Sequence, residues 1–129
     1  MFQRLTRAMA ALLILTLPLL TGCRGKTGAV AASPEKARDT LRQGLDAWKS
    51  GKTADAIKAS DSIIFSDSDL EKGSRLLNYE VQGDGASDGF DWQLRVKLTL
   101  QDATGNKDEK RAVYNVNTSP KLVIVRKEM

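Results

Sequence analysis

The stretch FDWQLRVKLTLQ, residues 90–101, decides the fold of this chain. Its apolar residues stand at every second position, and the residues between them are polar or charged. A helix would scatter these apolar side chains around its circumference, whereas a strand places all of them on one face. Burial of each large apolar side chain contributes about 1.5–3 kcal/mol, so this face has to be covered. The apolar set is Phe90, Trp92, Leu94, Val96, Leu98 and Leu100.

Segments of the same kind precede and follow this strand. The connections are rich in Gly, Asp and Asn, which favour tight turns, so the strands should form an antiparallel meander. The segment IIF at 63–65 is either a short edge strand or an apolar plug on a loop. The predicted inward residues are Leu77, Tyr79 and Val81 before the strand and Ala112, Tyr114 and Val116 after it, and residues 121–127 predict the last strand.

The cover for the apolar face is predicted at residues 34–50. Ser33 is a good N-cap, Pro34 suits the first helical position, and Gly51 suits the residue after the helix. Thr53 can cap a second, short helix. The long helix has one apolar stripe at helical spacing, formed by Ala37, Leu41, Leu45 and Trp48.

These elements predict an α+β domain over residues 34–129. One main N-terminal helix packs on a curved, four-stranded antiparallel meander, with Trp48 meeting Trp92 or Tyr114. The order of elements, together with WKSGK at 48–52, GSRLLNYEV at 73–81 and the closing VIVR, resembles small cystatin-like or NTF2-like domains. It is similar in particular to short uncharacterised lipoproteins of planctomycete-type bacteria.

The N-terminal residues 1–22 are typical of an export signal. Arg4 and Arg7 give a positive start, and the apolar run at 8–20 is shorter than the roughly 20 residues of a membrane-spanning helix. Leu20-Thr21-Gly22-Cys23 then resembles the lipobox of bacterial lipoproteins. The resemblance implies cleavage between Gly22 and Cys23 and attachment of diacylglycerol to the cysteine.

Two other interpretations of this end are an ordinary secretory signal with an incidental cysteine and an uncleaved anchor helix. If Cys23 is lipidated, residues 24–33 form a short flexible tether between the membrane and the domain. Lipoproteins retained in the inner membrane often carry Asp after the cysteine. Arg24 occupies that position here, so the outer membrane is favoured, with the domain facing the periplasm or the exterior.

The composition argues against several chemistries. The chain of 129 residues has no histidine and a single cysteine, so the commonest general base and metal ligand is missing. The net charge of +4 falls by two when Arg4 and Arg7 are removed, and the remaining charges are interspersed, which does not favour a nucleic-acid partner. We therefore expect no enzyme activity, no cofactor and no metal site.

One acidic segment spaces its carboxylates like a calcium loop. In DSDLE at 67–71 the acids alternate, but the glycine and the later acid that such a loop needs are replaced by Lys72 and Asn78. The sequence therefore predicts a solvated acidic turn.

The outer, polar face of the predicted sheet is the candidate docking surface. Arg95, Lys97 and Arg111, with Arg126 as a possible fourth member, would share this face. They could bind an acidic envelope protein or lipid headgroups, or they could simply keep the sheet soluble. The favoured function is a membrane-anchored, non-catalytic interaction module. The alternative is a small-ligand-binding domain with its pocket between the open end of the sheet and residues 53–72.

Overall fold

A computed structural model describes residues 33–127 of the chain. The predicted signal at 1–22, the cleavage and lipidation positions Gly22 and Cys23, and the tether up to residue 32 lie outside the described residues.

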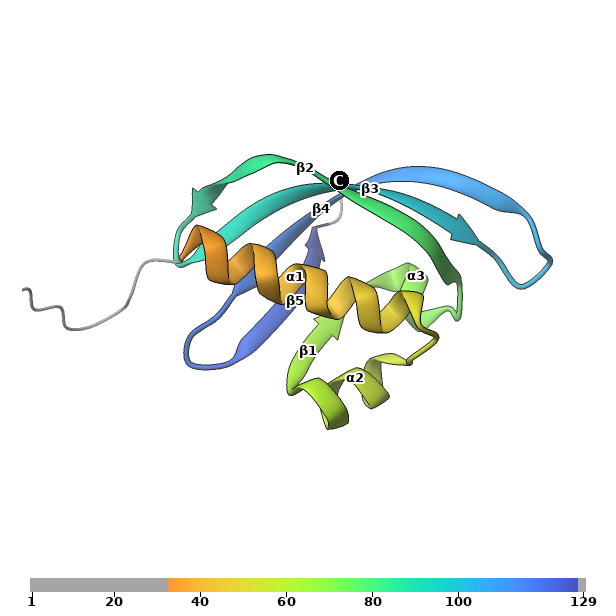
Figure 1. Cartoon of the computed structure of the whole chain (residues 1–129), viewed down its shortest axis with the longest axis horizontal. Helices are drawn as coiled ribbons and strands as arrows, with labels where there is room; N and C mark the ends of the chain where they lie inside the picture. The colour runs from red at the N-terminus through yellow and green to blue at the C-terminus, as the bar shows by residue number, and fades with distance from the viewer. Residues whose placement is uncertain (1–32, 128–129) are drawn as a thin grey trace, which may run out of the picture.

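The domain is α+β, with a long helix lying across one face of a sheet (Figure 1). The sheet has five strands in the spatial order β1-β5-β4-β3-β2. The elements are α1 (Pro34–Lys49), α2 (Ala54–Asp61), β1 (Ile63–Ser66), α3 (Ser68–Glu71), β2 (Arg75–Asp88), β3 (Asp91–Gln101), β4 (Lys107–Asn117) and β5 (Leu122–Lys127).

Helix α1 begins and ends where the capping residues predict. The Ser33 hydroxyl accepts the Lys36 N–H at 3.4 Å, and Gly51 follows the helix with a φ of 102° that favours glycine. The predicted second helix also forms, because the Thr53 hydroxyl accepts the Ala56 N–H at 3.1 Å. Both helix predictions are confirmed.

The prediction of a four-stranded antiparallel sheet is wrong in strand number and direction. Strands β2 to β5 do pair antiparallel in chain order, but β1 adds a fifth strand that runs parallel to β5. Residues 63–65 therefore belong to an edge strand, with Ile63 opposite Leu122. A parallel pair needs a crossover connection, and here the whole meander separates the two strands in sequence.

Two predicted inward positions are also wrong. The register of β2 shifts between Leu76 and Asn78, so Leu76 is 2% exposed while Leu77 is only half-buried. A bulge of this kind reverses the alternation on one side of it. Phe90 is 62% exposed, because it lies in the turn between β2 and β3 and the strand begins only at Asp91.

The core lies between the apolar stripe of α1 and the inner face of the sheet. The inward residues predicted in β4, Ala112, Tyr114 and Val116, are all buried, and so are Leu94, Val96, Leu98 and Leu100 of β3. Gly44 allows α1 to approach β5 closely, since a Cβ there would lie 2.6 Å from Ile124 Cδ1.

The aromatic contacts differ from the prediction for Trp48. Its ring packs edge-on against Phe65 at a centroid distance of 6.0 Å, and Phe65 packs edge-on against Tyr114 at 5.9 Å. Trp92 lies elsewhere and donates its indole N–H to the Asp84 carbonyl at 2.9 Å. Phe65 reaches this place because β1 joins the sheet beside β5, and neither the strand order nor the contact follows from local periodicity.

Candidate functional site

The predicted docking residues Arg95, Lys97 and Arg111 lie on one face of the sheet. Lys97 and Arg111 are opposite each other on β3 and β4, and Arg95 is two positions away from Lys97 along β3. Residues two apart on a strand share a face, and the buried residues between them face α1. The three basic residues therefore belong to the outer face, and Arg95 and Arg111 are exposed there.

This outer face also carries acidic and apolar side chains. Lys97 forms an ion pair with Glu109 at 3.7 Å and lies opposite Glu80. Exposed pairs of this kind contribute about 0–1 kcal/mol, so they do not prevent rearrangement on binding. Toward β1 the face becomes apolar, where Ile64 and Val125 are 37% and 40% exposed.

Helix α1 lies on the other side of the sheet, and no helix of the described chain covers the outer face (Figure 1). The face thus combines a basic region on β3 and β4 with an apolar strip on β1 and β5.

Arg126 does not belong to this surface, so its assignment there is wrong. It lies opposite Tyr114 and its side chain is only 11% exposed. Alternation along β5 places Arg126 on the same side as the buried Ile124. Its guanidinium faces inward and meets two carboxylates.

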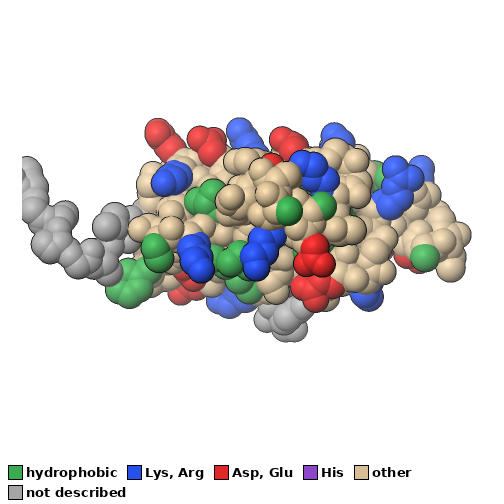
Figure 2. Space-filling model, turned by 90° about the horizontal axis from the view of Figure 1, so that it is seen from below, with side chains coloured by type: hydrophobic (Ala, Val, Ile, Leu, Met, Phe, Trp, Pro, Cys, Tyr) green, Lys and Arg blue, Asp and Glu red, His purple; other side chains and the backbone are tan. Residues whose placement is uncertain are grey.

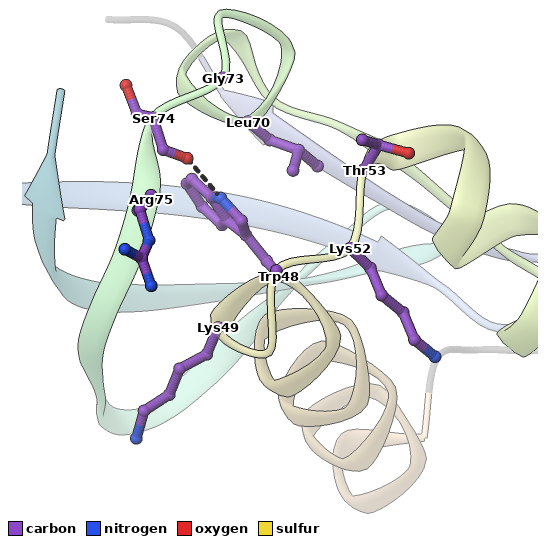
Figure 3. A pocket seen from close by; sticks show the side chains of 9 residues that line it. Trp48, Lys49, Lys52, Thr53, Leu70, Gly73, Ser74 and Arg75 are labelled. Carbon is purple, nitrogen blue, oxygen red and sulfur yellow. Dashed lines mark hydrogen bonds between the residues drawn. The ribbon is translucent and has the colours of Figure 1, made fainter. Parts of the chain in front are cut away.

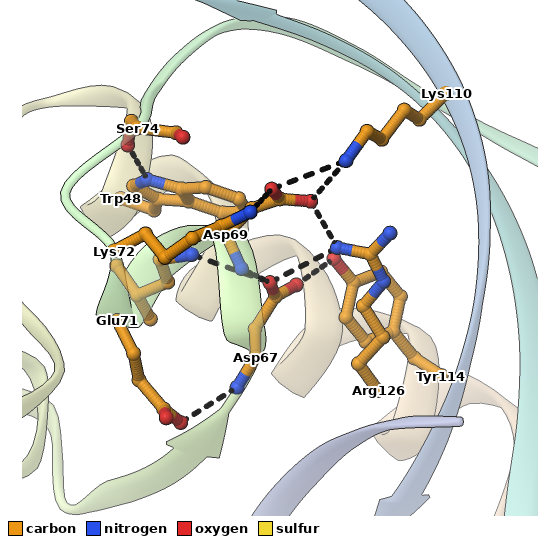
Figure 4. Close-up of polar contacts among 10 residues, drawn as sticks. Trp48, Asp67, Asp69, Glu71, Lys72, Ser74, Lys110, Tyr114 and Arg126 are labelled. Atoms are coloured by element: carbon orange, nitrogen blue, oxygen red, sulfur yellow. Dashed lines mark hydrogen bonds and ion pairs between the residues drawn. The ribbon is translucent and has the colours of Figure 1, made fainter. Parts of the chain in front are cut away.

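Those carboxylates are Asp67 and Asp69, and both are buried (Figure 4). Asp67 caps α3: its Oδ1 accepts the Asp69 N–H at 2.7 Å and the Leu70 N–H at 3.3 Å. Its Oδ2 accepts the Tyr114 hydroxyl at 2.5 Å, and Arg126 donates to Oδ1 at 3.2 Å. The prediction of a solvated acidic turn is wrong.

Asp69 is held by three cations. Lys110 reaches both carboxylate oxygens at 3.2 Å, Lys72 lies 3.5 Å from Oδ1, and Arg126 pairs with Oδ2. Burial raises the pKa of Asp69, but hydrogen bonds from Arg126 and Lys110 outweigh it and hold the pKa below its ordinary value of 3.8. Asp69 therefore stays ionised.

The same contacts shift the pKa values of Tyr114 and Arg126. Burial, followed by the charge of Asp67, raises the pKa of the Tyr114 hydroxyl, which remains a neutral donor. Burial lowers the pKa of Arg126, but its contacts with the two carboxylates outweigh that effect and raise it. We call Asp67, Asp69, Lys110, Tyr114 and Arg126 the buried charge cluster.

The polar groups of the buried charge cluster are satisfied within the protein. Its carboxylate oxygens are occupied by protein donors, and within residues 33–127 no group of three or more His, Cys, Asp or Glu side chains is placed to hold a metal ion. The cluster joins the β1–α3 segment to β4 and β5. Arg126, which directly follows the apolar run LVIV in β5, was the signal in the sequence that could have indicated it.

One of the hollows beside residues 53–72, where the ligand pocket was predicted, is small. A cavity of about 120 Å³ lies beside Trp48, between Thr53, Leu70 and Ser74 (Figure 3). Trp48 donates its indole N–H to the Ser74 carbonyl at 2.9 Å. In Figure 3 the side chains of Lys49 and Lys52 extend away from Trp48, so these two cations do not converge on the cavity.

Comparisons with protein-family models, with curated proteins and with solved structures find no match to this chain. Among the described helices, none is both long and apolar enough to cross a membrane.

Proposed function

We propose that this chain is a lipid-anchored envelope protein that acts as a non-catalytic interaction module. In this proposal Cys23 carries the lipid, and the outer face of the sheet docks an acidic region of a partner protein. The anchor part is supported by the lipobox pattern Leu20-Thr21-Gly22-Cys23 and by Arg4 and Arg7 before the apolar run.

The docking part is supported by one observation above all. Arg95, Lys97 and Arg111 share a sheet face that no described helix covers, and this face continues into the exposed Val125 on β5. Protein interfaces combine an apolar centre with a polar rim, and arginine is enriched in them. The three basic side chains on this face would favour partners of opposite charge and speed their encounter.

We include in the proposal a fold of cystatin-like or NTF2-like type, carried over from the sequence resemblance. The support is the long helix lying against a sheet whose strands β2 to β5 follow one another antiparallel. A ligand-binding role of the kind such folds often have is less favoured. The cavity beside Trp48 measures about 120 Å³, whereas small-molecule pockets usually measure about 300–1,000 Å³. The larger hollow near residues 53–72, of about 420 Å³ beside Lys58 and Ile64, is an open groove on the surface and does not enclose a ligand.

The test uses the full chain in its own cells, with a photoreactive amino acid in place of Arg95 or of Arg111. We expect each position to cross-link to the same discrete partner protein, because the two side chains share one face. The matched control carries the photoreactive residue at Lys49, which is exposed at the end of α1. Lys97→Glu should abolish the cross-link while leaving the protein folded, since Lys97 makes only a surface ion pair.

Cross-linking that survives Lys97→Glu, or that is equally strong from Lys49, contradicts docking through the sheet. The anchor is tested separately by fractionating cells that express Cys23→Ser. We expect the lipid label on the native protein to be absent from this variant, and the native protein to sediment with outer membranes. A native protein without the lipid label contradicts the anchor.

A further inference from the structure

A groove of about 420 Å³ lies where α2 ends and where β1 and β5 begin. Three apolar side chains line it, together with two lysines and one serine, and no acidic residue takes part. The lining residues are Lys58, Ser62, Ile64, Pro120, Lys121 and Leu122.

The parallel pairing of β1 and β5 creates this groove. Because Ile63 lies opposite Leu122, both strands begin at the same place, and the connections that lead into them lie side by side. Ser62 ends α2 with a left-handed φ of 57° and turns the chain sharply into β1. A four-stranded antiparallel sheet without β1 would have no such groove.

The groove exposes apolar and cationic side chains side by side to solvent. Lys58 and Lys121 are exposed, and Ile64 is one of three large apolar side chains that are strongly exposed among the described residues. The face seen from below in Figure 2 has apolar side chains between two basic ones in its left half. Figure 1 places the connection from β4 to β5 at the same end of the molecule as the start of α1.

We propose that this groove rests on the anionic headgroups of a lipid bilayer. In this arrangement Lys58 and Lys121 contact lipid phosphates, while Ile64 and Pro120 reach the boundary between headgroups and acyl chains. The proposal rests on the lipid anchor proposed above, because the predicted tether of about ten residues spans only about 15–20 Å and keeps the start of α1 near the membrane.

A lipid surface fits this groove better than a protein partner does. Lysine is depleted in the centres of protein interfaces, whereas lysines beside apolar side chains are typical of surfaces that lie in the membrane interface. The aliphatic part of a lysine can cover apolar groups while its ammonium stays among the phosphates. Each lysine near an anionic leaflet should strengthen binding about fivefold.

The test measures how quickly individual lysines are acetylated in the full, lipidated chain. The protein is reconstituted into vesicles of phosphatidylcholine alone or of phosphatidylcholine with phosphatidylglycerol, and modified lysines are quantified by mass spectrometry. We expect Lys58 and Lys121 to be acetylated several-fold more slowly on the anionic vesicles. Lys49 and Lys107, at the ends of α1 and of the β3–β4 turn, are the matched controls and should be unaffected.

Equal acetylation of Lys58 and Lys121 on the two kinds of vesicle overturns the proposal, even if the protein remains anchored to both. Failure of the protein to associate with either kind of vesicle overturns the anchor as well. A second variant, Lys58→Glu, should restore the acetylation of Lys121 on the anionic vesicles to its rate on neutral vesicles. Retention of slow acetylation in this variant shows that other groups make the contact and overturns the assignment.

Discussion

The β3–β4 hairpin and the β1–β5 pair belong to the same sheet, but they are stabilised by different interactions. The hairpin joins neighbours in sequence through a short turn, and its fully buried side chains are aliphatic or aromatic, although Lys110 and Tyr114 of β4 also reach the buried charge cluster. The β1–β5 pair joins strands separated by the whole meander, and the buried carboxylates that follow β1 meet Arg126 of β5. One pairing follows from local alternation, whereas the other depends on the buried charge cluster.

Because of this difference, mutations should destabilise the two regions in different ways. Truncation of an apolar side chain in the hairpin leaves a cavity, and the cost grows with the cavity's volume. Removal of one charge from the cluster leaves the remaining buried charges with fewer partners, which costs more than the lost pair itself contributes. The two regions can therefore be separated by mutation and by pH.

The largest expected effect is that of Asp67→Ala. This change removes the acceptor of the Tyr114 hydroxyl, one partner of Arg126 and the cap of α3. We expect the free energy of unfolding to fall by about 3–5 kcal/mol, measured by urea denaturation. The matched control is Asp108→Ala on β4, where the aspartate is exposed and the loss should stay below about 0.5 kcal/mol. Similar losses in both variants would mean that the cluster does not stabilise the β1–β5 region.

A smaller effect is expected when Asp69→Asn is compared with the native protein as pH falls. The pKa of Asp69 lies below 3.8 in the folded chain, so the unfolded chain binds the proton more readily. The stability contributed by the carboxylate is present above pH 3.8 and is lost as pH falls through the lower folded value. The stability difference between native protein and variant should therefore shrink within that acidic window.

The control for this pH experiment comes from the hairpin. Leu94→Ala removes a fully buried side chain of β3 and should cost about 2–5 kcal/mol at every pH. Urea denaturation over a series of acidic pH values checks both variants. A constant difference for Asp69→Asn down to the lowest pH would show that the ionised carboxylate does not contribute.

The smallest expected effect concerns the turns that lead into the two regions. Ser62 has a left-handed φ of 57° before β1, whereas Gly89 has a φ of 66° in the turn before β3. Ser62→Gly should relieve strain and raise the free energy of unfolding by up to about 1 kcal/mol, and Gly89→Ser should lower it by about 1 kcal/mol. Thermal unfolding measures both shifts. Effects of the same sign would contradict this account of the two turns.

The elements that local patterns define were predicted correctly. The stripe from Ala37 to Trp48 and the caps Ser33 and Thr53 determine both helices, and the alternation from Trp92 to Leu100 determines the inner face of β3. Caps and periodicity act over a few residues, so one sequence contains enough information for them. The shared face of Arg95, Lys97 and Arg111 follows from the same alternation once the two strands pair.

The candidate site was predicted only in part, for a reason that Arg126 illustrates. In the sequence it is one more basic residue near the end of a predicted strand whose inward and outward positions are difficult to assign from alternation. In the folded chain it lies on the inner face, because β5 pairs with β4 on one side and with β1 on the other. Leu76 and Phe90 are simpler cases, where a register shift and a turn interrupt the alternation.

The sequence by itself determined the bounds of α1, the start of α2, the extent of β3 to within a residue, and the apolar face that joins helix and sheet, because these depend on residues a few positions apart. The tertiary structure alone decided that β1 joins β5 in parallel, that Asp67 and Asp69 are buried, and that Trp48 meets Phe65. These contacts join residues distant in sequence, such as Asp67 and Arg126. Such a contact stabilises the fold only when both partners are buried together. Periodicity in the sequence, which reflects residues a few positions apart, does not reveal it.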